Sequence, residues 1–485
     1  MNAPNPVPKP TGRLFEGRRK VFPRKVDGTF RRLKWAIMVA TLAIYYLTPW
    51  LRWHRGAYAP DQAVLVDLAH RRFYMFSIEI WPNEFYYVVG LLVMAAVGLF
   101  LVTSAVGRAW CGYACPQTVW TDLFVHVERF IEGDRNAQLR LDRAPWGVEK
   151  LAKRTGKFAS WLVIAALTGG AWIFYFADAP TLARQFISGN APTVAYATVG
   201  VLTATTFIFG GLMREQVCIY MCPWPRIQSA MMDERSLSVT YRAWRGEPRT
   251  RGLKRSQEAE GPAGDCIDCE ACIAVCPTGI DIREGAQIGC ITCGLCIDAC
   301  DQMMTRIGRP TQLIGYLTEL DADHERRGEA AISPIRRLLH PRTIAYFLIW
   351  AGIGCAMLFA LGNRARIGVS VLQTRNPIWV RLSDGAVRNG YLIKIRNMEE
   401  RPRRFAISLD GMDALLWDEQ SGRGSAARRI VVAANADQVA QRQIFLATST
   451  KGEARTSIDF TVRALDAEGG SARATSFFER PETIP

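Results

Sequence analysis

Eight of the thirteen cysteines in this 485-residue chain fall into two short runs with one spacing. Residues 266–277 read CIDCEACIAVCP, which is C-x2-C-x2-C-x3-C-P, and Cys290, Cys293, Cys296 and Cys300 repeat that spacing. Three thiolates placed two residues apart wrap around one iron–sulfur cube, and the fourth cysteine of such a run ligates the other cube in two-cluster proteins. The spacing therefore predicts two [4Fe–4S] clusters.

The crossed pattern divides the eight cysteines into two predicted ligand sets. Cluster 1 takes Cys266, Cys269, Cys272 and Cys300, and cluster 2 takes Cys276, Cys290, Cys293 and Cys296. A zinc site is disfavoured, because it uses separated pairs of cysteines rather than three ligands in a row. Asp301 stands where Pro277 follows the first run, which leaves the ligand set intact.

Five apolar runs are each long enough to cross a bilayer, which takes roughly 17–25 residues. Hydrophobic residues make up 49% of the chain, yet charged residues reach 22%, which suits a membrane protein with soluble parts. The alternative, a soluble protein with buried helices, does not account for five runs nearly free of charge. The predicted spans are 35–51, 85–106, 158–177, 193–213 and 343–361.

Lysine and arginine are distributed unevenly about these spans. Residues 1–34, 107–157 and 214–342 hold 36 of them, against five in the two intervening loops. The positive-inside rule therefore places the N-terminus and the cysteine-rich insert in the cytoplasm. An odd number of spans then puts residues 363–485 outside. The net charge of +15 is thus a topology signal, and we expect no nucleic-acid partner.

Two further cysteine pairs, Cys111/Cys115 and Cys218/Cys222, follow the second and fourth spans. Both have the form C-x-Tyr-x-C-P, so two spans followed by this motif occur twice. A spacing of four puts both sulfurs on one helix face, and the proline ends or bends that helix. Four thiols at one membrane depth make a site for a soft metal, with Cu(I), zinc or another cluster as candidates. Buried inert thiols or a redox dithiol are the alternatives.

The last 120 residues change character. Short alternating runs at 369–374, 378–382, 391–396, 405–409 and 457–462 read as β-strands, and Asp384-Gly385, Asn389-Gly390 and Asp410-Gly411 as turns. This pattern predicts an antiparallel, Ig-like β-sandwich. The expected organisation is a basic segment 1–34, four membrane helices within 35–213, the second C-x3-C-P segment 214–240, a ferredoxin-like insert 241–342, a fifth span 343–361, and a β-domain 363–485.

No nucleotide-binding signature is visible. Gly352 and Gly354 lie inside an apolar span rather than after a strand, so they do not form a phosphate loop. The electrons must therefore come from another protein or from a membrane quinol.

The whole pattern resembles the CcoG/FixG/RdxA family of cytochrome c oxidase accessory proteins. Residues 266–301 are the most specific part of the likeness. The resemblance implies a multi-pass protein of the bacterial inner membrane, with its β-domain in the periplasm. It implies two [4Fe–4S] clusters on the cysteines assigned above and a redox or copper role for Cys111, Cys115, Cys218 and Cys222.

The function implied by the resemblance is reduction of Cu(II) to Cu(I) for the copper centre of a cbb3-type oxidase. Oxidase assembly factors, copper transporters or chaperones, and an unidentified electron donor are the implied partners. Two other classes stay open: an electron-transfer subunit that passes quinol electrons to a partner enzyme, and a non-enzymatic assembly scaffold.

Overall fold

A computed structural model describes residues 20–56, 59–252, 263–329, 340–399, 401–467 and 469–481. It divides into two compact units, Met1–Leu51 with Val64–Cys355, and Arg52–Ala63 with Ala356–Pro485. The first unit carries the long helices and all the clustered cysteines, and the second carries the C-terminal β-domain. Most of the predicted basic segment 1–34 lies outside the described residues, which begin at Lys20.

Four helices in the described part of the chain are long and apolar enough to cross a membrane. They are α2 (Tyr86–Val106), α6 (Val148–Ile173), α8 (Thr193–Thr206) with its π-helical continuation η3 (Phe207–Met213), and α16 (Pro341–Gly362). Three of them follow the predicted spans closely. Helix α6 starts ten residues before the predicted 158, because the charged stretch that precedes the apolar run is also helical.

The first predicted span, 35–51, overlaps α1 (Thr29–Leu47), which starts six residues earlier, ends four residues sooner and is not among those four helices. Its first turns contain buried Arg31 and Lys34, so charge reduces its apolar length. The backbone N–H groups of Phe30 and Arg31 donate to the Asp298 carboxylate, at 3.2 and 2.8 Å, which caps the helix. A membrane-spanning role for α1, and with it the count of five, stays a prediction.

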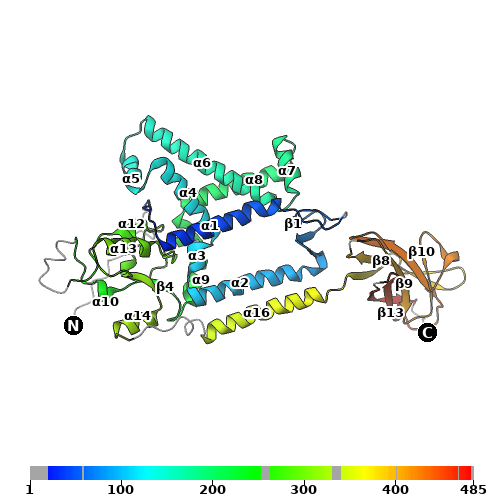
Figure 1. The fold of residues 1–485 in the computed structure, drawn as a ribbon. Helices are drawn as coiled ribbons and strands as arrows, with labels where there is room; N and C mark the ends of the chain where they lie inside the picture. The colour runs from blue at the N-terminus through cyan, green and yellow to red at the C-terminus, as the bar shows by residue number, and fades with distance from the viewer. Residues whose placement is uncertain are drawn as a thin grey trace. The chain divides into compact units, whose positions relative to one another are not determined.

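The long helices of the first unit lie beside one another in pairs (Figure 1). Helices α2 and α16 run side by side, joined by a 2.8 Å hydrogen bond between the Ser104 and Thr343 hydroxyls. Helix α6 packs on α8 and on α4 (Pro116–Glu132), where the Phe124 and Trp161 rings stack. Shorter helices α5 (Arg135–Arg143) and α7 (Ala179–Ile187) and an unpredicted sheet complete the connections. That sheet has strands β1 (Val64–Asp67), β2 (Arg72–Met75) and β3 (Ile78–Ile80).

The ferredoxin-like insert is small and is closed by an antiparallel pair of strands, β4 (Ser238–Tyr241) and β5 (Ile314–Leu317). Between them lie α10 (Ala243–Gly246), α12 (Ala271–Val275) and α13 (Leu295–Arg306), and α14 (Glu319–Arg326) follows. Both α12 and α13 start after a left-handed residue, Glu270 at φ 55° and Gly294 at φ 72°. This turn follows the first two cysteines of each run and directs the third back toward them.

The C-terminal unit is a sandwich of two antiparallel sheets, as predicted. One sheet has the order β10-β12-β8-β6 with β7 beside β8, and the other β11-β9-β13-β14. Buried aromatic and branched side chains from both sheets, such as Phe405, Ile393 and Phe460, fill the core. Bounds are β6 (Ile367–Gln373), β7 (Trp379–Arg381), β8 (Val387–Asn397), β9 (Arg403–Asp410), β10 (Leu415–Asp418), β11 (Arg429–Ala434), β12 (Gln438–Thr448), β13 (Arg455–Ala464) and β14 (Ser471–Glu479).

One predicted turn in this unit is wrong. Asn389-Gly390 lies inside β8, paired with Leu446 and Phe445 of β12. Asn389 is fully buried there, and Gly390 admits the neighbouring Phe445 ring. Cross-strand packing thus outweighs the local turn preference of the dipeptide.

Candidate redox centres

The first predicted ligand set comes together in the structure. Cys300 lies close enough to Cys266, Cys269 and Cys272 for all three to raise the pKa of its thiol, which burial already raises, to about 12. These four cysteines line a cavity of about 340 Å³ whose other walls include Tyr241, Met304, Leu313 and Ile314. Cys269 is exposed, so this set lies at the surface of the insert.

The second set is also assembled, with Cys293 buried and the other three cysteines partly buried. The pKa of the Cys296 thiol is raised by burial and by Cys293, Cys276 and Cys290. All four line a second cavity of about 360 Å³, with Ile280, Ile282, Ile291 and Leu295 among its walls. Cys272 of the first set also acts on Cys296, so the two sets are neighbours.

The residues at both places fit a [4Fe–4S] cube. Each cavity contains the four cysteines of its predicted set, one of them from the partner run, and an apolar wall; Cys272 of the first set also lines the second cavity. Cys300 faces the first set and Cys276 the second, which is the crossed arrangement. Raised thiol pKa values mean that cluster binding must displace protons here. A bound cube supplies one-electron transfer, and the exact ligand assignment stays a prediction.

The two C-x3-C-P pairs do not each lie on one helix, contrary to the expectation from spacing. Cys111 lies in α3 (Ala109–Tyr113), whereas Cys115 precedes Pro116, the first residue of α4. Cys218 lies in the π-helical turn η4 (Val217–Met221), and Cys222 ends it before α9 (Trp224–Met231). Proline at the start of a helix costs no hydrogen bond, so each motif joins two helices instead of bending one.

These four thiols nevertheless meet at one place, called here the four-cysteine site. Burial raises the pKa of Cys111 to about 11, against the opposing charge of Arg108, and Cys115 and Cys222 add to the rise. Burial raises that of Cys218 to about 12, with contributions from the other three. Without a metal, the Cys111, Cys115 and Cys218 thiols are therefore neutral at pH 7. Within the described residues, no three Cys, His, Asp or Glu side chains are placed to hold a single metal ion.

The first C-x3-C-P segment touches the second ligand set directly. A Cβ added to Gly112 would lie 2.6 Å from the Ile291 carbonyl oxygen and 3.1 Å from the Cys293 Cα, so only glycine permits this approach. The Tyr113 hydroxyl donates to the Cys293 carbonyl at 3.0 Å and meets the Tyr316 hydroxyl at 3.2 Å. Backbone contact of this kind is a short path for an electron between the four-cysteine site and cluster 2.

Two polar residues that sequence reasoning missed also position this region. Arg108 is buried, donates to the Ile288 carbonyl at 2.6 Å, and lowers the pKa of Cys111, Cys218 and Cys290 against the effect of burial. Its charge therefore acts on both the four-cysteine site and the second set. Gln228 of α9 is fully buried and accepts from the Cys111 thiol at 3.0 Å. The sequence offered one signal for Arg108, its position three residues before Cys111. It offered none for Gln228.

Family models match three parts of the chain. Residues 213–319 match a 4Fe-4S dicluster domain, and residues 88–132, which contain Cys111 and Cys115, match a 4Fe-4S binding domain. Residues 357–481 match the IG-like fold at the C-terminal of FixG.

Curated relatives cover nearly the whole chain. The nitrogen fixation protein FixG of Rhizobium meliloti is 55% identical over 464 residues, covering 91% of this chain and 88% of its own. The protein belongs to the FixG/RdxA family. Protein RdxA of Cereibacter sphaeroides is 54% identical, covering 95% of this chain and 97% of its own, and protein RdxB of the same organism is 55% identical over 399 residues.

Membership of the FixG/RdxA family confirms the resemblance on which the sequence analysis relied. With the two 4Fe-4S family matches, it makes this chain an iron–sulfur protein of the electron-transfer type. The four apolar helices are consistent with an inner-membrane location.

Proposed function

We propose that this protein is a membrane-bound iron–sulfur oxidoreductase that reduces Cu(II) to Cu(I) at the four-cysteine site, for assembly of the copper centre of a cbb3-type oxidase. The observation that carries the proposal is the backbone contact of Gly112 with Ile291 and Cys293. It joins a soft, sulfur-rich site to the second of the two predicted cluster sites. Copper is the substrate of this reaction and does not reside in the protein.

The order of the cysteine sets suggests a direction for the electrons. The first set is nearest the surface, the second adjoins both the first and the four-cysteine site, and the four-cysteine site receives the copper. Each reduced cluster gives up one electron, and each Cu²⁺ takes one to become Cu⁺. Thiolates bind Cu(I) in preference to Cu(II), so the four-cysteine site raises the copper potential and favours reduction.

A second candidate has its own support. The segment with Cys111 and Cys115 matches a 4Fe-4S binding domain. In this alternative the four cysteines hold a third cube, and the chain is an electron relay to a partner enzyme. Iron analysis of anaerobically purified protein separates the two: two cubes contain about eight irons and three contain about twelve. A value near four would contradict both.

Copper reduction is tested with protein whose clusters have been reduced by dithionite and freed of excess reductant. Cu(II) is then titrated in, and Cu(I) and the cluster absorbance are followed together. We expect one Cu(I) for each cluster electron lost. Changing both Cys111→Ser and Cys218→Ser should slow copper reduction and leave the absorbance of the two ferredoxin-like clusters unchanged.

The matched control is Cys355→Ser, which removes the one cysteine outside the clusters, an exposed residue of α16. It should reduce copper at the parental rate. If the Cys111→Ser, Cys218→Ser double variant also reduces copper at the parental rate, the four-cysteine site is not where copper is reduced. If the parent's reduced clusters fail to reduce Cu(II), the relay function replaces the reductase.

The proposed topology has the N-terminus and clusters in the cytoplasm and the β-domain in the periplasm of a bacterial inner membrane. Its support is the lysine and arginine asymmetry. A reporter active only in the periplasm should be active when fused after Pro485 and silent when inserted near Gly252. The reverse pattern would contradict this orientation.

A further inference from the structure

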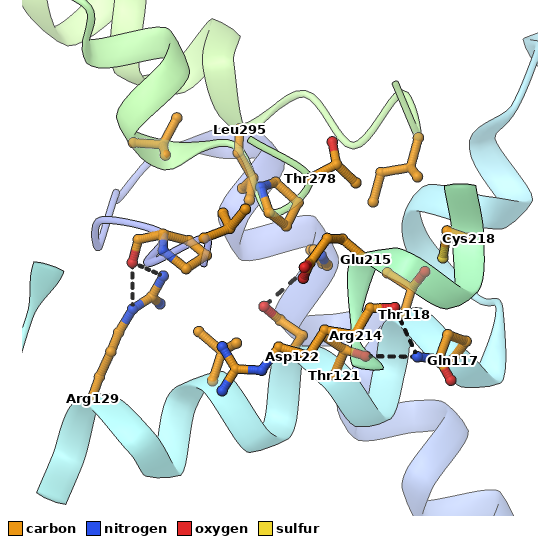
Figure 2. A pocket seen from close by; sticks show the side chains of 17 residues that line it. Gln117, Thr118, Thr121, Asp122, Arg129, Arg214, Glu215, Cys218, Thr278 and Leu295 are labelled. Carbon is orange, nitrogen blue, oxygen red and sulfur yellow. Dashed lines mark hydrogen bonds and ion pairs between the residues drawn. The ribbon is translucent and has the colours of Figure 1, made fainter. Parts of the chain in front are cut away.

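The electron source of this protein is unassigned, and one cavity in the first unit is placed to hold it. This interface cavity lies among α1, α4, the residues after η3, and the ferredoxin-like insert (Figure 2).

The interface cavity reaches both proposed redox sites. Cys218 of the four-cysteine site lies in one wall. Pro277 and Thr278, which follow Cys276, and Leu295, which stands between Cys293 and Cys296, lie in another. A molecule bound in the cavity is therefore next to cluster 2 and to the four-cysteine site at once.

The polar groups in the cavity are buried acids and bases rather than surface charges. The Asp122 carboxylate accepts a 2.9 Å hydrogen bond from the Arg31 guanidinium, and the Lys34 ammonium lies 3.9 Å from the same oxygen. Burial disfavours its charge, but Lys34 and Arg31 outweigh that effect and keep the pKa of Asp122 below its usual value. Glu215 is 5% exposed and turns its carboxylate toward the middle of the cavity, facing Asp122 (Figure 2).

A second, open cavity of about 1320 Å³ adjoins the first, sharing Val21, Arg214 and Glu215 with it. Its walls include Phe158 and Trp161 of α6 and Leu212 of η3, at the ends of two candidate membrane helices. Phe158 and Leu212 are exposed apolar side chains. An apolar group against Phe158 and Leu212 would lie beside Arg214 and Glu215, the residues that the two cavities share, while Lys150 and Asp142 make another part of the open cavity polar.

We propose that the interface cavity binds a membrane quinol, which is the electron donor of this protein. A quinol has the required chemistry: an apolar tail, a polar ring, and two electrons and two protons to release. Its two O–H bonds break and a quinone leaves. A cube held by the second set would take one electron and pass it to a neighbouring redox site before the other electron follows. Glu215 lines both cavities, so it can take each proton in turn and pass it to the open cavity. This proposal shares one requirement with the proposed function, which is that the second ligand set holds a reducible cluster.

The test measures quinol-driven cluster reduction without copper. Full-length protein in phosphatidylcholine nanodiscs, with oxidised clusters, is mixed anaerobically with decylubiquinol, and the cluster absorbance is followed. In the parent protein, the cluster absorbance should show reduction during the time that the mixing experiment follows. Glu215→Gln keeps the shape and removes the proton acceptor, so reduction should slow roughly 10²-fold. Thr121→Trp, which fills the cavity from α4, should slow it roughly tenfold or more by weakening quinol binding.

Matched controls are Glu234→Gln, an exposed glutamate outside both cavities, and dithionite, a reductant that needs no quinol site. The control variant should behave as the parent, and dithionite should reduce every protein fully. Because a buried tryptophan can also disturb folding, a photoreactive quinone is cross-linked to the unaltered protein as an independent measurement. The label should appear on peptides within 117–129 or 214–218.

Quinol that leaves the parental clusters oxidised, parental rates in both variants, or labelling elsewhere would each overturn the proposal. Copper reduction by the dithionite-reduced protein is a separate measurement. Copper can be reduced even if quinol does not reduce the clusters, and quinol can reduce the clusters even if copper is not reduced. The two proposals can therefore fail separately.

Discussion

The two C-x-Tyr-x-C-P segments have the same motif and different surroundings. In the first, Tyr113 is 8% exposed and is hydrogen-bonded to the second ligand set. In the second, Tyr220 is 50% exposed. Gly112 of the first motif corresponds to Ile219 of the second, whose side chain could not make the same close backbone approach. The duplicated cysteines thus supply one site together, while the residues between them differ in role.

The charge three residues before each pair differs as well. Arg108 precedes Cys111 and acts on cysteines of both redox sites, whereas Glu215 precedes Cys218 and lies in the interface cavity. One copy of the repeat has become the contact with the clusters, and the other has become part of a cavity wall. The residues that are not cysteines therefore give two similar motifs dissimilar environments.

The largest expected effect tests what the two copies share. Cys111→Ser and Cys222→Ser should each slow copper reduction by on the order of 10²-fold or more, since even indirect supports of metal ligands cost 10–100-fold. Stopped-flow formation of Cu(I) measures this. A loss in only one of the two variants would show that a single pair is sufficient.

The next test separates the copies by packing. Gly112→Ala forces a Cβ against the Ile291 carbonyl and should lower the free energy of unfolding by about 1–3 kcal/mol. Ile219→Ala in the second copy should not disturb that contact. Thermal loss of the cluster absorbance is the measurement. Equal stability of Gly112→Ala and the parent would mean that α3 does not pack on the second ligand set.

A smaller effect concerns charge. Arg108→Gln removes a buried positive charge that favours the reduced, more negative state of both redox sites. We expect their potentials to fall by about 40 mV, which corresponds to about 1 kcal/mol for one electron. Glu215→Gln should not lower either potential. Redox titration followed by electron paramagnetic resonance measures both, and an unchanged potential in Arg108→Gln would contradict this role.

The smallest effect concerns hydrogen bonding. Tyr113→Phe removes a donor to the Cys293 carbonyl and should cost about 0.5–1.5 kcal/mol of stability. The Tyr316 hydroxyl, which donates to the Thr292 carbonyl at 2.5 Å, should then hold the loop alone. Tyr220 is 50% exposed, so Tyr220→Phe should cost less stability than Tyr113→Phe in the same thermal assay. An equal loss in the two variants would show that the two hydroxyls contribute equally.

Much of the architecture was predictable, for local reasons. Three of the four candidate membrane helices coincide with the predicted spans because a run of apolar residues determines them without reference to the rest of the chain. The β-sandwich was predictable from its alternating runs. Strands β10 and β11 and the sheet β1–β3 were missed because their short segments carry too weak a pattern. Strands β12 and β14 were also missed, although they are 11 and 9 residues long, because each begins with mainly polar and small residues.

The sequence by itself determined which atoms can bind metal and how they are grouped, because thiolate chemistry and ligand spacing are properties of adjacent residues. It also determined the membership of the FixG/RdxA family. Only the tertiary structure decided that the two C-x3-C-P pairs meet, that Gly112 rests on the Cys293 backbone, and that Asp122 and Glu215 face one cavity. Those pairings join residues about 90 to 180 positions apart. Packing of whole helices brings them together, and no local pattern of residues specifies it.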